Sequence, residues 1–213
     1  MRFKQFLTES EIKNLADLIH EVSPGYLGRT GRKFLYRGME GTKGRAIPVE
    51  VPHFDGGYAY EIKTRTDRKP KDTISHLHRY FDQWFEARFG HKFRSAAVFC
   101  SGSPPTFYGR KYAIFPIGKW SYVWSPNIRD LSEDFGYQYE QHMIDADNSY
   151  NTTLNHNAII KADVFDTMDT LGYTNNQLDK ALAGSNEIMV DCGSYLAVPA
   201  DILPLGVRWL EKV

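Results

Sequence analysis

The feature of this sequence that most restricts its fold is a series of short apolar runs, four to six residues long, most of them ended by glycine, proline or serine. Such runs predict short β-strands, because a few β-branched or aromatic residues between turn residues suffice for a strand. We expect strands at residues 33–37, 95–100, 112–116, 119–124, 187–190, 195–198 and 207–210, with one or two more within 45–63. The run at 95–100 is nearly continuous and predicts a buried strand.

Two amphipathic helices are predicted ahead of most of these strands. Residues 8–22 carry apolar side chains at helical spacing, after Thr8 and Glu11 in capping-box positions. Residues 72–89 carry an aromatic and aliphatic stripe and end at Gly90, a residue typical of helix ends. Two shorter helices are expected at 162–171 and 175–183. Helices that precede a series of strands, rather than alternate with them, favour an α+β fold.

Length and composition predict one domain. A chain of 213 residues with 42% hydrophobic content is long enough for a sizeable core. Residues 125–160 lack periodicity, so we predict a long insertion over 125–183 within a single domain spanning 1–213. No apolar run approaches the ~18 residues of a membrane span, and the first residues lack the hydrophobic region of a signal peptide. With only two cysteines, Cys100 and Cys192, the sequence favours a cytoplasmic protein without membrane partners.

The net charge is zero, but the two halves of the chain have opposite charges. Residues 1–120 hold 21 Lys and Arg against 12 Asp and Glu, whereas residues 121–213 hold 5 against 14. Either the halves neutralise each other within one fold, or the basic half binds a phosphate-bearing ligand, from a dinucleotide to a nucleic acid.

Several common kinds of site are excluded by their missing motifs. The sequence has no glycine-rich phosphate loop of the Rossmann or Walker type and no Gly-x-Ser-x-Gly motif of hydrolases. His76 and His78 lie two residues apart on a predicted helix, which places them on different faces and gives poor metal geometry. We therefore expect no metal. Cys100 and Cys192 lie in apolar runs, where packing is the expected role.

Polar residues at the ends of three predicted strands remain as candidates for a site. Tyr36-Arg37-Gly38 ends the first strand, Ser101-Gly102-Ser103 follows the strand that ends Phe99-Cys100, and Glu187 begins Ile188-Met189-Val190. This order of Arg, Ser and Glu at strand edges resembles the Arg–Ser–Glu motif of the ADP-ribosyltransferases. Residues 193–198 are also similar to the hairpin that closes the fold of that family.

The resemblance implies a split β-sheet core with N-terminal helices, and NAD as a substrate. It implies that Arg37, with Tyr36, Gly38 and Ser103, binds NAD, since a guanidinium forms forked hydrogen bonds to phosphate. Ser101 would orient the ribose and Glu187, the catalytic carboxylate. A carboxylate suits that role because cleavage of the nicotinamide–ribose bond develops oxocarbenium-like charge. The residues do not decide which aromatic ring, among Tyr36, Phe107 and Tyr108, stacks on nicotinamide.

The sequence departs from the family pattern at two positions and offers one rival residue. Gly102 stands where threonine is common. Ser185 stands where arginine-modifying members carry Glu or Gln, so arginine is disfavoured as the acceptor. Glu133 is a rival for the carboxylate role, although its surroundings indicate the start of a solvated helix. Arg94, ahead of the apolar strand, is either a phosphate ligand or a plain surface charge.

The expected function is therefore NAD-dependent ADP-ribosylation of a macromolecular acceptor, a protein or nucleic acid. The first seven residues resemble the N-termini of proteins from large tailed phages, which indicates a phage-encoded effector acting on host molecules in the host cytoplasm. The alternative is a non-enzymatic phage accessory or virion-associated binding protein. A third interpretation is a nucleic-acid-binding protein that uses the basic N-terminal half.

Overall fold

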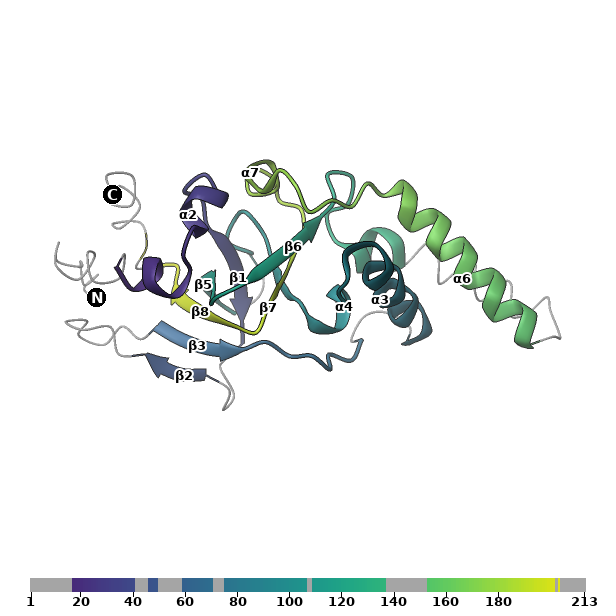
Figure 1. The fold of residues 1–213 in the computed structure, drawn as a ribbon, viewed down its shortest axis with the longest axis horizontal. Helices are drawn as coiled ribbons and strands as arrows, with labels where there is room; N and C mark the ends of the chain where they lie inside the picture. Colours follow the sequence, from purple (N-terminus) through teal and green to yellow (C-terminus); the bar gives the residue numbers. More distant parts are fainter. Residues whose placement is uncertain are drawn as a thin grey trace.

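Two antiparallel β-sheets form the centre of the molecule (Figure 1). The structure is a computed structural model that describes residues 17–40, 46–49, 59–70, 75–106, 109–136, 153–201 and 203. A five-stranded sheet has the order β1-β5-β8-β3-β2, and a three-stranded sheet the order β4-β7-β6. The strands are β1 (Leu35–Met39), β2 (Ala46–Val49), β3 (Ala59–Lys63), β4 (Val98–Cys100), β5 (Arg110–Pro116), β6 (Trp120–Trp124), β7 (Ile188–Cys192) and β8 (Ser194–Pro199). The predicted α+β class is confirmed.

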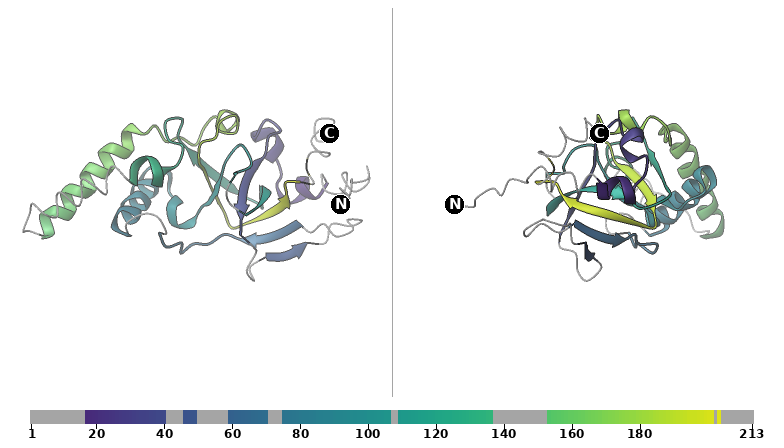
Figure 2. Two further views of the ribbon diagram at one scale, coloured as in Figure 1. Left: turned by 180° about the vertical axis from the view of Figure 1, so that it is seen from behind. Right: turned by 60° about the vertical axis from the view of Figure 1, so that its left-hand side comes forward.

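Two of the helices pack on one face of the smaller sheet. The helices are α2 (Tyr26–Arg29), α3 (Ser75–Phe89), α4 (Phe93–Ala96), the π-helical turn η1 (Ser132–Gly136), α6 (Thr153–Thr170) and α7 (Leu178–Ala181), and residues 17–22 are also helical. The predicted stripe of α3 is buried at Leu77, Phe81 and Phe85, in one cluster with Val123 of β6 and Met189 of β7. Figures 1 and 2 show α3 and α6 together at one end of the molecule. In the part of the chain that the structure describes, no helix has the length and apolarity needed to cross a bilayer.

The two sheets meet at one bridge between β1 and the end of β4. The backbone N–H of Tyr36 donates to the carbonyl of Ser101 at 2.8 Å, and the N–H of Ser101 donates back to Tyr36 at 2.9 Å. Beyond this pair the strands separate, because β1 continues along β5 while β4 continues along β7. The bridge therefore brings the residue after Tyr36 beside the polar end of β4.

The buried strand predicted at 95–100 begins later than expected. Residues 93–96 form the short helix α4, and β4 starts only at Val98. The cause is Asp82, a buried carboxylate on α3, which accepts the backbone N–H groups of Arg94 at 2.9 Å and Ser95 at 3.1 Å. These bonds satisfy donors at the start of a helix, so the first part of the apolar run becomes helical.

The helix predicted at 162–171 is longer than expected. The structure has one helix, α6, over Thr153–Thr170, and α7 is shorter than the predicted helix at 175–183. The buried positions of α6, Ile160, Val164 and Met168, recur every four residues, but the Asn and Asp residues among them obscured the pattern. Residues 137–152 lie outside the described residues. The insertion at 125–183 and the single domain stay predictions.

Among the described strands, β8 does not form the expected hairpin with the strand that precedes it. β7 ends at Cys192 and β8 begins at Ser194, yet β7 pairs with β4 and β6 while β8 pairs with β3 and β5. The chain therefore changes sheets at Gly193. The predicted strand at 207–210 lies outside the described residues, as does the first half of the predicted helix at 8–22.

Gly102 is required by a close approach between two segments of the chain. A Cβ atom at Gly102 would lie 2.2 Å from the backbone oxygen of Leu182, the residue that ends α7. No side chain fits against a backbone atom at that distance. Glycine is therefore required at position 102 because α7 packs directly on this turn.

We expect Gly102→Ala to lower the free energy of unfolding by about 1–3 kcal/mol, since backbone must move to admit the methyl group. Urea denaturation followed by circular dichroism measures the change. Gly193→Ala is the matched control, because a Cβ there meets no atom within 4 Å and its effect should be small. Equal stabilities for the two variants would show that α7 does not press on Gly102.

Candidate functional site

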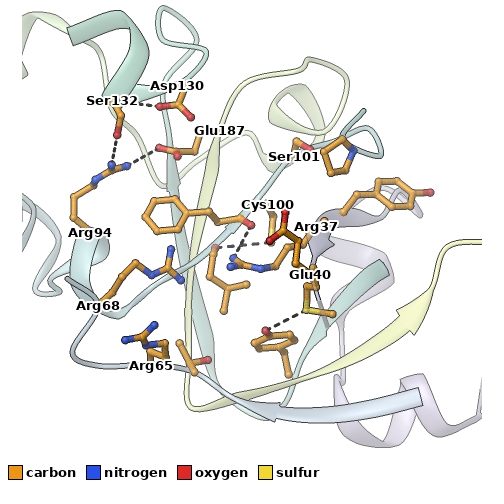
Figure 3. Close-up of a pocket in the computed structure, with 18 of the residues that line it drawn as sticks. Arg37, Glu40, Arg65, Arg68, Arg94, Cys100, Ser101, Asp130, Ser132 and Glu187 are labelled. Atoms are coloured by element: carbon orange, nitrogen blue, oxygen red, sulfur yellow. Dashed lines mark hydrogen bonds and ion pairs between the residues drawn. The ribbon is translucent and has the colours of Figure 1, made fainter. Parts of the chain in front are cut away.

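One cleft of about 960 Å³ lies where the two sheets separate (Figure 3). Its walls come from β1, the end of β3 and the residues after it, the end of β4, residues 129–133 and the start of β7. The Lys and Arg residues that line it are Arg37, Lys63, Arg65, Arg68, Lys69, Arg94 and Arg129, and the acidic ones are Glu40, Asp130, Glu133 and Glu187. The cleft is thus more basic than acidic, which favours anionic ligands.

The structure brings most of the sequence-predicted site residues to this cleft. Tyr36, Arg37, Gly38, Ser101 and Glu187 all line it. The remaining candidate, Ser103, is exposed and is not among the lining residues. Of the three candidate aromatic rings, Tyr36 lines the cleft, whereas residues 107 and 108 lie outside the described part of the chain.

Arg37 is held in place without a carboxylate partner. Its Nη1 donates to the backbone oxygen of Phe99 at 3.1 Å, while its buried Nε has no hydrogen-bond partner. No ion pair joins Arg37 to a carboxylate among the described residues. A positioned guanidinium with an unused donor is suited to binding an anion.

The hydroxyl of Ser101 is engaged within its own turn. Ser101 Oγ donates to the backbone oxygen of Ser103 at 2.7 Å, which makes the turn before the two prolines. The structure gives no hydrogen bond between the side chains of Ser101 and Glu187, both of which are described. In this state the hydroxyl therefore keeps lone pairs for a ligand, but it does not orient Glu187.

Glu187 is fixed to the loop ahead of it by backbone and amide bonds. Its N–H donates to the carbonyl of Arg129 at 2.8 Å. The neighbouring Asn186 donates from Nδ2 to the carbonyls of Ser125 at 2.7 Å and Ile128 at 2.9 Å. These bonds hold the 125–129 loop beside the start of β7 and leave the Glu187 side chain directed into the cleft.

The carboxylate of Glu187 is nearly buried and pairs with Arg94. The distance from Glu187 Oε1 to Arg94 Nη1 is 3.2 Å, and the two side chains are 13% and 8% exposed. Burial raises the pKa of Glu187 to about 7, although Arg94 opposes that rise. Asp130 adds to the rise by repulsion. A carboxyl group of this kind exchanges its proton near neutral pH, as general acid–base groups require.

Sequence reasoning did not find the role of Arg94. The expected surface charge is wrong, because Arg94 is 7% exposed. Besides the pair with Glu187, its Nη2 donates to Ser132 Oγ at 2.6 Å, and its Cζ lies 4.8 Å from the centre of the Phe99 ring. No sequence pattern indicated helix α4, in which Asp82 accepts the backbone N–H of Arg94. This helix is what places the Arg94 side chain in the interior.

The rival carboxylate Glu133 is exposed at the edge of the cleft. Its backbone N–H and that of Ser132 donate to Asp130 Oδ1, at 3.2 Å and 2.7 Å. Asp130 therefore caps the turn η1, as the sequence indicated for this segment. Its exposure makes Glu133 a weaker candidate than Glu187 for a role that requires a low-dielectric environment.

The other reactive groups near the cleft are engaged or protonated. Burial raises the pKa of the Cys100 thiol to about 12, so it is not a nucleophile at neutral pH. His78 lies against Ser95, with Nε2 3.1 Å from its Oγ, and burial lowers its pKa. Within the described ranges there is no group of three or more side chains suited to a metal ion.

Comparison of the chain with protein-family models, with curated proteins and with solved structures returned no significant match. What the cleft does therefore rests on its own chemistry.

The contribution of Glu187 to the stability of the protein should fall as pH rises from about 4.5 to 7. The folded state holds the Glu187 proton more tightly than the unfolded chain does, so this group favours folding at low pH and loses that contribution through the folded pKa near 7. The loss is on the order of 3 kcal/mol at most. Urea unfolding at a series of pH values measures it.

Glu187→Gln should remove this pH dependence, and Glu133→Gln, which alters an exposed acid of the same cleft, should keep it. The comparison uses slopes against pH, because Glu187→Gln also leaves Arg94 unpaired. Identical slopes for wild type and Glu187→Gln would contradict the buried carboxyl.

Proposed function

We propose that this chain is an NAD-dependent ADP-ribosyltransferase that modifies a macromolecular acceptor. One observation carries the proposal: Arg37, Ser101 and Glu187 come from three separate elements, up to 150 positions apart, and line one cleft. The resemblance to the Arg–Ser–Glu motif had required their convergence. The split between the two sheets agrees with the core that the family resemblance implies.

The reaction transfers the ADP-ribosyl group from NAD to an acceptor nucleophile. The bond between the ribose C1′ and the nicotinamide nitrogen breaks, and its electron pair leaves with nicotinamide. A bond then forms between C1′ and the acceptor atom, which loses a proton. The products are nicotinamide, the ADP-ribosylated acceptor and one proton.

Arg37 would bind the diphosphate of NAD. Its guanidinium has an unpartnered Nε and no described carboxylate partner, so a phosphate would satisfy both its charge and its free donor. Tyr36 and Gly38 flank it on β1. Ser101, across the bridge from Tyr36, would accept a hydrogen bond from a ribose hydroxyl through its free lone pairs.

Glu187 would act at the ribose carbon. Its ionised form stabilises positive charge at C1′ during cleavage, and the low exposure of the side chain strengthens that interaction. The same carboxylate then accepts the proton of the attacking group. Arg94 keeps a share of Glu187 ionised near neutral pH by opposing the effect of burial.

The acceptor follows from the residue at position 185. Ser185, which lines the cleft, cannot supply the carboxylate or amide that arginine-modifying members place there. The acceptor is therefore a protein group other than arginine, or a nucleic acid. The phage-like N-terminal residues support a host molecule, in the host cytoplasm, as the target.

NAD should stabilise the protein and Glu187→Gln should abolish transfer. At about 100 times its dissociation constant, NAD should add ~2.7 kcal/mol of stability, visible as a thermal shift. Incubation with labelled NAD and bacterial lysate should release nicotinamide and label an acceptor. Glu187→Gln should lose both activities while keeping its circular dichroism spectrum, whereas Glu133→Gln should keep them.

If folded protein gives neither a thermal shift nor nicotinamide release, the enzyme proposal fails and the non-enzymatic binding protein takes its place. If Glu133→Gln rather than Glu187→Gln is inactive, the catalytic carboxylate has been assigned to the wrong residue.

Arg94→Gln should move the pH dependence of nicotinamide release. Without the guanidinium the pKa of Glu187 rises further, so the acid limb of the rate profile should shift to higher pH. A pH–rate profile of the variant against wild type measures the shift. Arg79→Gln, an exposed arginine of α3, is the control and should leave the profile unchanged. A lower rate with an unmoved profile would mean that Arg94 only supports the fold.

A further inference from the structure

A second group of cations lies in the cleft, apart from Arg37. It belongs to residues 63–70, here called the basic strap, which continue from the end of β3 without forming a helix or further strand. Lys63, Arg65 and Lys69 are exposed, Arg68 is half-buried, and all four line the cleft. These four residues have no part in the NAD binding proposed above.

The strap is held in a fixed position at two points. The N–H of Thr64 donates to the carbonyl of Gly193 at 3.1 Å, where the chain changes sheets. The N–H of Arg68 donates to the carbonyl of Ser95 at 3.1 Å, and its Nη2 donates to the carbonyl of Ala97 at 3.1 Å. A solvated surface loop would not need these contacts with the junction of β7 and β8 and with helix α4 and its C-cap. They preorganise the charges between the two anchors, which lowers the entropic cost of binding a ligand.

The positive charge of the strap is nearly uncompensated. Within the described ranges, Lys63, Arg68 and Lys69 form no ion pair with a carboxylate. Arg65 pairs only with Asp67 of the strap itself, at 3.7 Å, and the Asp67 side chain is 85% exposed, so that pair is weak. Burial, together with repulsion from Arg37, Arg94 and Arg65, lowers the pKa of Arg68 to about 10. A bound anion would relieve this repulsion.

The guanidinium of Arg68 also lies over an aromatic ring. Its Cζ is 4.3 Å from the centre of the Phe99 ring, which fixes the plane of the guanidinium. Asp130 and Glu187 lie on the other side of the cleft. Figure 3 shows these two at one end and Arg65 and Arg68 at the other, while Glu40 lies beside Arg37. An anionic polymer would therefore lie on the strap side and direct one group toward Glu187.

We propose that the basic strap binds the phosphate backbone of a single-stranded nucleic acid, which is the acceptor. This inference rests on the proposed function. Lys63 and Arg65 are two residues apart on an extended segment, about 6.5 Å along the chain, and Lys69 follows Arg68. Successive phosphates of a nucleic-acid backbone can bind these cations together, whereas a phosphorylated side chain offers only one phosphate group. A single strand is favoured because a base inside a duplex cannot enter the cleft without leaving its stack. An atom of the nucleotide then takes the ADP-ribosyl group by the balanced step given above.

The test measures binding of a fluorescein-labelled single-stranded 12-mer by fluorescence anisotropy at several salt concentrations, with full-length protein and no NAD. Lys63→Gln, Arg65→Gln and Lys69→Gln are combined in one variant. The control combines Lys119→Gln, Lys161→Gln and Lys180→Gln, three exposed lysines outside the cleft that change the net charge equally. Both variants are checked by circular dichroism and thermal unfolding.

The strap variant should bind the oligonucleotide 10- to 100-fold more weakly at 0.1 M salt, on the order expected for three lost phosphate contacts. Its salt slope should fall by about 2, because each contact with a single strand contributes about 0.7. The control variant should bind as wild type does. A matching duplex should bind wild type more weakly than the single strand.

Equal affinities for the strap variant and the control would overturn the proposal, as would tighter binding of duplex. A third result would also overturn the proposal: the strap variant no longer labels lysate proteins but binds the oligonucleotide as wild type does. The strap would then bind an acidic protein. The outcome is separate from that of the proposed function: oligonucleotide binding needs no NAD, and the thermal shift with NAD needs no oligonucleotide. If oligonucleotide binding fails, the thermal shift still tests NAD binding, and if the thermal shift fails, oligonucleotide binding still tests the strap.

Discussion

The buried pair between Arg94 and Glu187 is the interaction on which the cleft depends. Their side chains lie 3.2 Å apart with little exposure, so replacing either one leaves the other without its hydrogen-bond partner in a nearly buried position. Each partner is also held by hydrogen bonds of a neighbouring side chain. Asp82 holds the backbone of Arg94, and Asn186 holds the loop beside Glu187. The helical layer and the smaller sheet are thus joined at the point where the carboxylate faces the cleft.

The split between the sheets provides the opening itself. Among the described residues, the bridge from Tyr36 to Ser101 pairs a strand of one sheet with the end of a strand of the other, and the strands on either side of it then follow different partners. Side chains near the bridge face the gap, and backbone carbonyls at the edge of β4 orient the guanidinium groups of Arg37 and Arg68. Cations held by carbonyl groups, rather than by carboxylates, retain their full charge for a ligand. This explains how a chain with no net charge presents a basic cleft.

The sequence predicted the parts of the fold that depend on local pattern. Strands β5, β6, β7 and β8 and helix α3 lie close to the predicted residues, because apolar periodicity and turn residues reflect local burial. The α4 helix was missed because its cause, Asp82, lies twelve positions earlier in the chain and acts through tertiary contact. The pairing of β7 and β8 with different sheets was missed for a similar reason, since neighbours in sequence do not identify partners in space. The length of α6 was underestimated because polar residues dilute its apolar positions.

Only those residues of the candidate site that belong to the ordered Arg, Ser and Glu motifs could be predicted from the sequence. Arg37, Ser101 and Glu187 stand at the ends of strands that the sequence pattern itself predicted. Arg94 had no such signal, because a buried arginine looks the same in the sequence as a surface charge. The necessity of glycine at position 102 likewise became visible only with the backbone of Leu182 beside it.

A crystal structure of the Glu187→Gln variant with bound NAD would show whether the cleft is an NAD site. We expect the diphosphate within hydrogen-bond distance of the Arg37 guanidinium, with the nicotinamide ribose between Ser101 and the side chain at position 187. NAD bound elsewhere on the molecule, or a diphosphate in the cleft that makes no contact with Arg37, would contradict it.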